Sequence, residues 1–369
     1  MRSGLALSVA IMSMVVATGC ATGKAPRTAR MSLAAPVLAV LNVGVEPKTL
    51  DVQQAQTATI YYELTRSASV TVDLVDEEGR VIRQLKAQSQ RGKHTIPWDA
   101  TAADGQLVAG GVYRYVIRAH AQSSEALYDP STETGGEELL AEPFTFDAQT
   151  GAMEWVMPKA GYARLNIGLQ GYPHLRTLVD WQPLEAGRQR VVWDGRDASG
   201  LMTLMQHPNL AMKLQTFALP WNTLIVRNSP TMSRSLSDEP RYPPLAKPQA
   251  PYLHARHTRA VCHAPRLRVD FPEAKGVDAQ QRPIVSGVVP VRVSVHPDDA
   301  QEVVSSRFEV ALYEDTVFLV EEQDGTNPFT YLWDTRRLSE GEHLLTVNIF
   351  TYDDHYGVLT RPVVIQKNL

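Results

Sequence analysis

The chain lacks the sequence features that mark most enzymes and nucleic-acid-binding proteins. Only two of its 369 residues are cysteines, too few for a disulfide framework and too far apart for a haem attachment motif. Its formal net charge of −4 offers no basic field that would attract nucleic acid. The motifs of serine hydrolases, zinc peptidases, P-loop NTPases and dinucleotide-binding folds are also absent. We therefore expect a protein that is not an enzyme, needs no cofactor and binds no nucleic acid.

A helical pattern is missing as well. Beyond residue 20, no segment keeps apolar residues at a period of 3.6. Short stretches instead alternate between apolar and polar residues, for example 290–295, 308–312 and 344–349. This alternation is typical of half-buried β-strands, so the sequence predicts an all-β fold.

What the sequence does contain is a stretch that occurs twice. Each copy has an opening glycine, a Trp-Asp pair and a closing glycine at the same spacing: Gly92, Trp98, Asp99 and Gly105, then Gly187, Trp193, Asp194 and Gly200. Alternate residues before each Trp-Asp pair are apolar, which predicts a strand. The aspartate can accept hydrogen bonds from N–H groups just beyond it, and the glycine allows a turn with positive φ. We interpret these residues as a structural signature rather than a catalytic one.

The repeat extends beyond this stretch. Upstream, residues 46–51 match 142–147, residues 69–74 match 164–169, and Arg83 matches Arg176. Downstream, residues 111–118 alternate again and are predicted to return as the hairpin partner of the first Trp-Asp strand. Together the two units, 44–121 and 140–227, resemble the Ig-like β-sandwich domain of the flagellar hook-capping protein. The resemblance implies a fold and an extracytoplasmic location. It implies no particular role, because such sandwiches serve many roles.

A third unit covers residues 266–369. Its Trp333-Asp334 strand precedes a Gly-x-His strand at residues 341–343, an order that resembles another bacterial Ig-like sandwich. We therefore predict three Ig-like sandwiches in tandem, with residues 122–139 as a linker between the first two. A proline-rich linker or strap, residues 228–265, precedes the third.

The N-terminus has the pattern of a lipoprotein signal peptide over residues 1–19. Arg2 supplies the positive charge, and the apolar run of residues 5–16 is too short to cross a bilayer comfortably. Small residues lead directly to Cys20, as in a bacterial lipobox. Cleavage there would leave an acylated Cys20 that anchors the protein in membrane lipid. The alternatives are an ordinary signal peptide with an incidental cysteine, or an anchor that is never cleaved.

Residues 20–43 begin with small and polar residues, which favours a flexible tether. Ala21 rather than aspartate follows the cysteine, and this favours the outer membrane. The sequence thus predicts a lipid-anchored protein of the bacterial cell envelope.

One group of residues has the spacing of metal ligands: His254, His257, Cys262 and His263. Imidazole and thiolate together suit zinc or copper. The structural alternative to a metal site is a strap of tyrosines and histidines packed on a sandwich. If Cys20 is acylated, Cys262 has no partner in the chain and is expected to be buried or bonded to another protein.

The carboxylates beside the tryptophans suggest two further hypotheses, a glycosidase site and a calcium loop. Asp99 with Asp104, or Asp194 with Asp197, form the acidic pairs that a glycosidase needs, although such acids must face each other across a cleft. Residues 194–200 also resemble a calcium loop, but lack its bidentate glutamate. We favour turn capping for all four.

The function that we expect is that of a structural or adaptor subunit of an envelope or surface complex, with a protein partner added at an exposed sheet edge. A carbohydrate-binding module is one alternative, because Trp155, Trp181 and Trp221 lie outside the Trp-Asp strands. A metal or redox accessory protein is the other.

Overall fold

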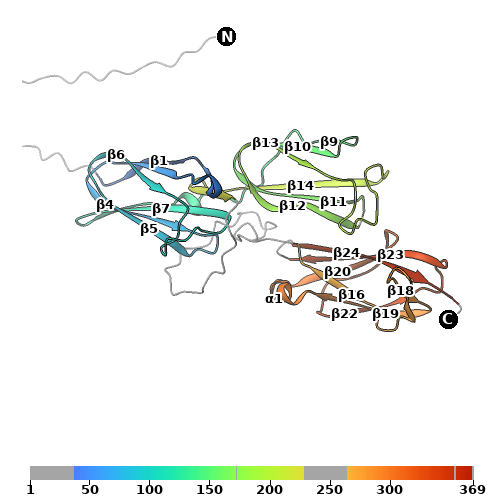
Figure 1. Ribbon diagram of the computed structural model, residues 1–369. Coiled ribbons are helices and arrows are strands. Elements are labelled where there is room, and N and C mark those ends of the chain that lie inside the picture. The colour runs from blue at the N-terminus through green and yellow to red at the C-terminus, as the bar shows by residue number, and fades with distance from the viewer. Residues whose placement is uncertain (1–36, 172, 228–263, 353–354, 368–369) are drawn as a thin grey trace, which may run out of the picture. The chain divides into compact units, whose positions relative to one another are not determined.

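The computed structural model describes residues 37–171, 173–227, 264–352 and 355–367. Within these ranges the chain forms pairs of β-sheets that enclose separate hydrophobic cores (Figure 1). The predicted all-β fold of Ig-like sandwiches is therefore confirmed.

In the first sandwich, a three-stranded sheet of order β1-β3-β6 faces a larger sheet of order β2-β15-β7-β4-β5, with β8 beside β7. Its strands are β1 (Val40–Glu46), β2 (Thr49–Asp51), β3 (Ala58–Leu64), β4 (Ala68–Val75), β5 (Val81–Ser89), β6 (Gly92–Trp98), β7 (Gly111–Ala121), β8 (Ser124–Tyr128) and β15 (Thr223–Arg227). Every second residue of β3 is buried, as expected of a strand with one face on a core.

The second sandwich repeats this arrangement, with sheets of order β13-β10-β9 and β12-β11-β14. Its strands are β9 (Thr145–Asp147), β10 (Ala152–Met157), β11 (Gly161–Leu169), β12 (His174–Leu184), β13 (Gly187–Val192) and β14 (Leu210–Ala218). The pair β10 and β13 corresponds to β3 and β6, and the run β12-β11-β14 corresponds to β5-β4-β7. The sequence repeat is thus a repeat of strand order.

The predicted hairpin between the Trp-Asp strand and residues 111–118 is wrong. β6 pairs with β3, whereas β7 lies in the opposite sheet and pairs with β4. Nearly all of β7 is buried on both faces, including the side chain of Arg114. Such a strand belongs in the middle of a sheet, and the loop after the Trp-Asp pair carries the chain across to it.

The sequence placed residues 223–227 at the end of the second sandwich, but they form β15 in the first. There β15 pairs antiparallel with β7 and parallel with β2. Leu224 and Val226 point into the core of the first sandwich. The apolar run correctly indicated a buried strand; the sheet to which it belongs depends on tertiary packing.

The segment expected to be a linker, residues 122–139, is also largely structured. Its first part is β8, which extends the first sandwich by pairing with β7. Its last part lies along β14 of the second sandwich, where Leu139 N–H donates to the carbonyl of Thr216 at 2.8 Å. The chain between the two sandwiches therefore passes from one sheet directly to another.

A buried asparagine holds the return of the chain to the first sandwich. Asn222 lies just before β15, and its Nδ2 donates to the carbonyl of Tyr115 at 2.9 Å and to Asp129 Oδ1 at 3.2 Å. The backbone carbonyl of Asn222 accepts from the N–H of Tyr115 at 3.0 Å. Apolar side chains from both sandwiches pack together in a shared cluster: Val112, Tyr162, Trp181, Phe217, Leu219 and Ile225.

The third sandwich has sheets of order β16-β19-β22 and β17-β18-β24-β23-β20-β21. Its strands are β16 (Leu267–Asp270), β17 (Gly276–Val277), β18 (Pro283–Val285), β19 (Val288–Val295), β20 (Phe308–Glu314), β21 (Val317–Glu322), β22 (Phe329–Asp334), β23 (Gly341–Thr351) and β24 (Tyr356–Ile365). As predicted, the Trp-Asp strand β22 comes before the Gly-x-His strand β23, and Trp333 is buried in the core.

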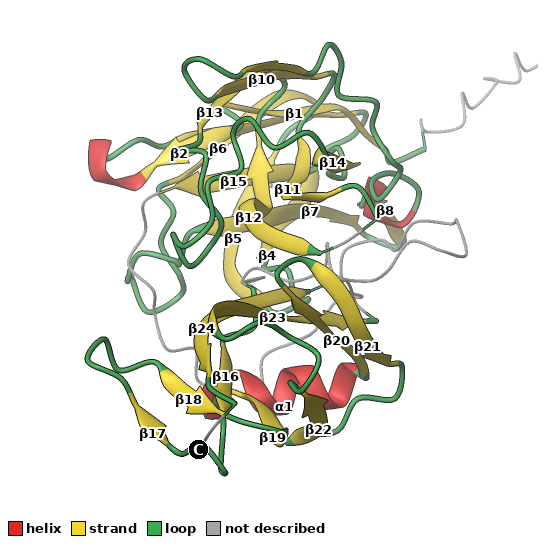
Figure 2. Ribbon diagram, turned by 90° about the vertical axis from the view of Figure 1, so that its right-hand side faces the viewer, coloured by secondary structure: helices red, strands yellow, loops and turns green. Residues whose placement is uncertain are grey.

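One α-helix, α1 (Pro297–Ser306), was not expected from the sequence (Figure 2). Three features mark its start. His296 is the N-cap and Pro297 occupies the first turn. The negative charges of Asp298 and Asp299 interact favourably with the positive N-terminal end of the helix dipole. At ten residues it is too short for the helical period to stand out. Among the described residues, no helix has the length and apolar character needed to cross a membrane.

Replacing Leu224 by alanine should destabilise the first sandwich although the residue follows the second. Removing a fully buried leucine side chain costs about 2–5 kcal/mol of unfolding free energy. Hydrogen exchange followed by mass spectrometry should show faster exchange in β7 and β4, with β10 and β13 little affected. The matched control is Leu127→Ala, an exposed leucine of the same sheet. Loss of protection in the second sandwich alone would contradict the strand assignment.

Candidate functional site

The first Trp-Asp turn is held by hydrogen bonds within a few residues. The buried Trp98 donates its indole N–H to the carbonyl of Thr101 at 2.9 Å. Asp99 Oδ1 accepts from the hydroxyl of Thr101 at 2.6 Å and from its backbone N–H at 3.2 Å. The Thr101 hydroxyl is the main reason that the pKa of Asp99 lies below its usual value. This carboxylate caps a turn.

The second copy has the same geometry. Trp193 is buried and its indole N–H donates to the carbonyl of Arg196 at 2.8 Å, again three residues on. Asp194 Oδ1 accepts from the backbone N–H of Arg196 at 3.1 Å. The interpretation of Trp98, Asp99, Trp193 and Asp194 as structural is consistent with both turns.

An arginine from the opposite sheet reinforces each turn. Arg83 in β5 donates from Nη1 to the carbonyl of Ala102 at 2.6 Å. Its counterpart in β12, Arg176, donates from Nη1 to Asp194 Oδ1 at 2.7 Å and to the carbonyl of Arg196 at 3.0 Å. The repeat matched these two arginines, but sequence reasoning gave them no role. Each one ties the two sheets of its sandwich together at the turn.

The closing glycines take the conformation that the sequence predicted. Gly105 has a φ of 81° and Gly200 a φ of 75°, in the left-handed region where glycine is favoured. Their N–H groups donate to the carbonyls of Ala102 and Asp197 at 3.0 and 3.1 Å. The same tight turn therefore closes both copies.

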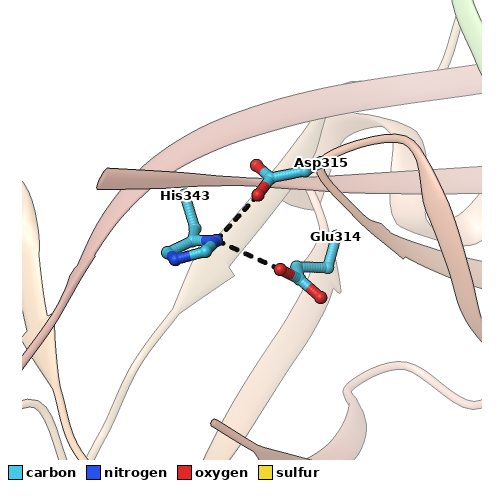
Figure 3. A group of neighbouring side chains, drawn as sticks. All are labelled: Glu314, Asp315 and His343. Atoms are coloured by element: carbon cyan, nitrogen blue, oxygen red, sulfur yellow. Dashed lines mark hydrogen bonds and ion pairs between the residues drawn. The ribbon is translucent and has the colours of Figure 1, made fainter. Parts of the chain in front are cut away.

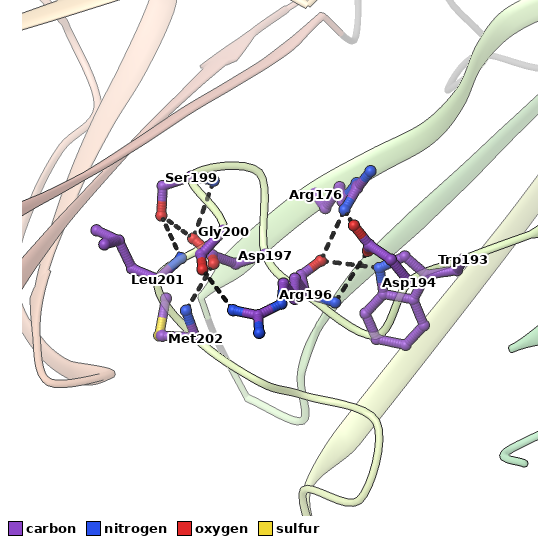
Figure 4. Close-up of polar contacts among 9 residues, drawn as sticks. All are labelled: Arg176, Trp193, Asp194, Arg196, Asp197, Ser199, Gly200, Leu201 and Met202. Carbon is purple, nitrogen blue, oxygen red and sulfur yellow. Dashed lines mark hydrogen bonds and ion pairs between the residues drawn. The ribbon is translucent and has the colours of Figure 1, made fainter.

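The loop considered for calcium is stabilised by its own donors (Figure 4). Asp197 is buried, and its Oδ1 accepts from the N–H of Met202 at 2.7 Å. Its Oδ2 accepts from the N–H of Ser199 at 3.1 Å and from the hydroxyl of Ser199. Asp194 is engaged by Arg176, as described above. Since these carboxylates already accept hydrogen bonds, turn capping accounts for them better than an ion does.

The acidic pairs considered for a glycosidase are engaged in turns. Asp99 and Asp104 lie in one turn of the first sandwich, Asp194 and Asp197 lie in one loop of the second, and each carboxylate accepts hydrogen bonds there. Asp104, like Asp197, caps its own loop, accepting from the N–H of Gln106 at 2.9 Å.

The tryptophans that suggested carbohydrate binding are mostly buried. Trp155 and Trp181 are 2% and 3% exposed and belong to hydrophobic clusters, so the expectation of exposed rings is wrong for both. Trp221 is 65% exposed and lies beside a hollow of about 280 Å³. Of these three tryptophans, Trp221 alone has an exposed ring.

Two groups of predicted residues lie outside the described residues. These are Cys20, the proposed lipidation site, and the potential metal ligands His254, His257, Cys262 and His263. Both assignments stay predictions from the sequence.

A cluster that sequence reasoning missed lies in the third sandwich (Figure 3). Glu314 ends β20, Asp315 follows it in the turn to β21, and His343 is in the adjacent strand β23. His343 Nδ1 is 2.7 Å from Asp315 Oδ2 and 3.1 Å from Glu314 Oε1, while its Nε2 is 3.0 Å from the carbonyl of Ser339. The sequence gave no signal for this cluster, because strand pairing brings Glu314 and His343 together.

Electrostatics in this cluster favour positive charge on the histidine. Burial alone lowers the pKa of His343, but the Ser339 carbonyl and the two carboxylates together outweigh it and the pKa is raised. The pKa of Glu314 is also raised, by burial and by the neighbouring charge of Asp315. The cluster thus concentrates negative charge around one imidazole nitrogen.

Comparison with known protein families supports the assignment of the first sandwich. Residues 48–123 match the FlgD Ig-like domain family. The match coincides with the unit whose resemblance to the flagellar hook-capping protein was noted from its motifs. No curated protein matches this chain.

Solved structures similar to this chain include an endo-β-1,4-mannanase from Thermotoga petrophila at 13% identity and a TM-score of 0.21, covering 29% of this chain and 20% of the mannanase. A tandem repeat from the extending region of a large adhesion protein is 12% identical, with a TM-score of 0.21, over 89% of this chain and 74% of the repeat. A bacterial ice-binding adhesin is 10% identical, with a TM-score of 0.18, over 90% of this chain and 99% of the adhesin chain. This chain therefore spans a fifth of the mannanase's length, and likeness at this level carries no functional conclusion.

Asp197→Ala should destabilise the second sandwich by about 2–3 kcal/mol, because three donors lose a buried acceptor. Chemical denaturation should reveal this loss, and calcium added to the wild type should leave the midpoint unchanged. The matched control, Asp104→Ala, removes an exposed cap and should cost about 0.5 kcal/mol. Calcium-dependent stability that disappears in Asp197→Ala would instead favour an ion site.

Thr101→Val should raise the pKa of Asp99 toward its ordinary value, because the hydroxyl that lowers it is removed. A folded-state pKa below the unfolded value stabilises the protein above the unfolded pKa, and this contribution is lost as pH falls through the folded pKa. In the variant, protonation of Asp99 in acid should therefore reduce the free energy of unfolding by less than it does in the wild type. NMR titration of the carboxyl carbon measures the shift. Asp147, whose pKa is lowered by Thr150, serves as the internal control and should not change.

Proposed function

We propose that this protein is a non-enzymatic structural subunit of the bacterial cell envelope, held to a membrane by lipid on Cys20. The observation that carries the structural role is the return of β15 to the first sandwich. Since a strand that follows the second sandwich completes a sheet of the first, the second sandwich is inserted into the first and is connected to it at two points, after β8 and before β15. Such a joint suits a spacer or support.

The polar residues of the repeated signature support the same role. The carboxylates of Asp99, Asp194 and Asp197 all accept hydrogen bonds from nearby donors and hold turns. The match of residues 48–123 to an Ig-like family adds a fold that commonly serves as a structural module.

An adaptor role is supported by an exposed sheet edge in the third sandwich. β21 is the last strand in its sheet order, and its Val317 and Phe318 are exposed. An extended segment of a partner protein can add to such an edge through backbone hydrogen bonds. We infer that the partner is another protein of the envelope.

The lipid anchor rests on the lipobox. The first described strand begins at Val40, so the stretch after Cys20 separates the acylated residue from the first sandwich. A spacer of small and polar residues allows the sandwiches to stand away from the membrane surface.

Cys20→Ser should abolish lipidation and release the protein from membranes. In cells fed an alkyne analogue of palmitate, the wild type should carry the label and sediment with membranes, whereas the variant should be unlabelled. Cys262→Ser is the matched control and should keep both properties, since it removes the other cysteine. An unlabelled wild type, or a label retained by Cys20→Ser, would refute the anchor.

A further inference from the structure

We propose that Glu314, Asp315 and His343 form a binding site for one divalent transition-metal ion, of which Zn²⁺ is the best fit. The site belongs to the third sandwich and does not depend on the proposed lipid anchor.

Strand pairing brings all three residues together. β20 and β23 are paired neighbours, so the end of β20 lies beside the start of β23. Asp315 is held to β23 twice: its N–H donates to the carbonyl of Leu344 at 2.9 Å, and its Oδ1 accepts from the N–H of Leu344 at 2.8 Å. These bonds leave Oδ2 directed at His343 (Figure 3). The potential ligands therefore come from a hydrogen-bonded framework rather than from free side chains.

The surroundings of Nε2 bear on which imidazole nitrogen can bind a metal. Nε2 of His343 lies 3.0 Å from the carbonyl of Ser339 and 3.2 Å from the hydroxyl of the same residue. When Nε2–H donates to the carbonyl, Nδ1 presents its lone pair toward the carboxylate oxygens of Asp315 and Glu314. A cation bound among these three acceptors removes their mutual repulsion. Metal-binding histidines are commonly oriented in this way, by a carbonyl that accepts from the second nitrogen.

The donor set selects the class of metal. One imidazole nitrogen and two carboxylate oxygens suit zinc, whereas calcium and magnesium prefer oxygen alone. Ligands of a tetrahedral zinc ion lie about 3.3 Å apart, since each bond is about 2.0 Å. The separations of 2.7 and 3.1 Å at Nδ1 thus need only a small outward movement.

Burial leaves one side of the cluster open. The side chains of His343 and Glu314 are largely buried, while that of Asp315 is 46% exposed. Two carboxylates balance the charge of a divalent ion, and the open side admits the ion and allows water to complete its coordination. Bound there, the ion would join the β20–β21 turn to β23 and stabilise the third sandwich.

The test uses the full chain, stripped with EDTA and then titrated with ZnCl₂ by calorimetry at neutral pH. Because His254, His257, Cys262 and His263 could bind zinc as well, the titration is run in a background where all four are replaced by alanine or serine. One zinc ion should bind per chain. His343→Ala and Asp315→Asn should each weaken binding at least tenfold, and binding should fall in acid as protons compete for Nδ1.

The matched control is His120→Ala. His120 Nδ1 lies 3.2 Å from Glu125 Oε1, but this pair is exposed and has a single carboxylate, so zinc binding should not change. Circular dichroism checks that each variant folds. If His343→Ala unfolds the third sandwich, Co²⁺ is used as the probe instead. The absorption of bound Co²⁺ should then appear in the wild type and weaken in Asp315→Asn. Absence of zinc binding, or binding unchanged in these variants, would overturn the proposal and leave the cluster as an ion pair around a protonated histidine.

Discussion

The indole N–H of the repeated tryptophan sets the geometry on which the first two sandwiches depend. An acceptor for the indole N–H favours the burial of Trp98 and Trp193, because an unpaired buried donor costs about 1–3 kcal/mol. In both copies that acceptor is the carbonyl three residues on. The bond folds the chain back at the edge of the core, where the next aspartate caps the turn and an arginine of the opposite sheet reaches it.

The exchange of β15 turns two repeated modules into one joined unit. A free edge on β7 would expose the backbone of a strand that is otherwise buried on both faces, and β15 covers that edge with a run of apolar residues. The buried Asn222 satisfies backbone groups at the crossing and fixes the register. A tandem repeat thereby gains a joint that its sequence repeat does not contain.

Much of the fold could be predicted from the sequence because it follows from local chemistry. The alternation of residues before Trp98 and Trp193, and the left-handed turns at Gly105 and Gly200, are set by side chains close in the chain. The partners of β7 and β15 could not be predicted, since a buried apolar run fits the middle of any sheet. The same limit hid Arg83 and Arg176 as turn clamps, and it hid the cluster around His343. Their partners are distant in sequence and meet only through sheet pairing.

The contrast between the aspartates shows how a structural carboxylate differs from one that can do chemistry. Both oxygens of Asp197 accept hydrogen bonds from N–H or O–H donors of the loop that it holds. Asp315 uses one oxygen in the same way, but its other oxygen faces an imidazole nitrogen and the carboxylate of Glu314 is close by. In the third sandwich, either a proton on Nδ1 or the metal ion that we propose offsets the repulsion between the carboxylates of Glu314 and Asp315, whereas the loop of Asp197 in the second sandwich supplies N–H and O–H donors for that carboxylate.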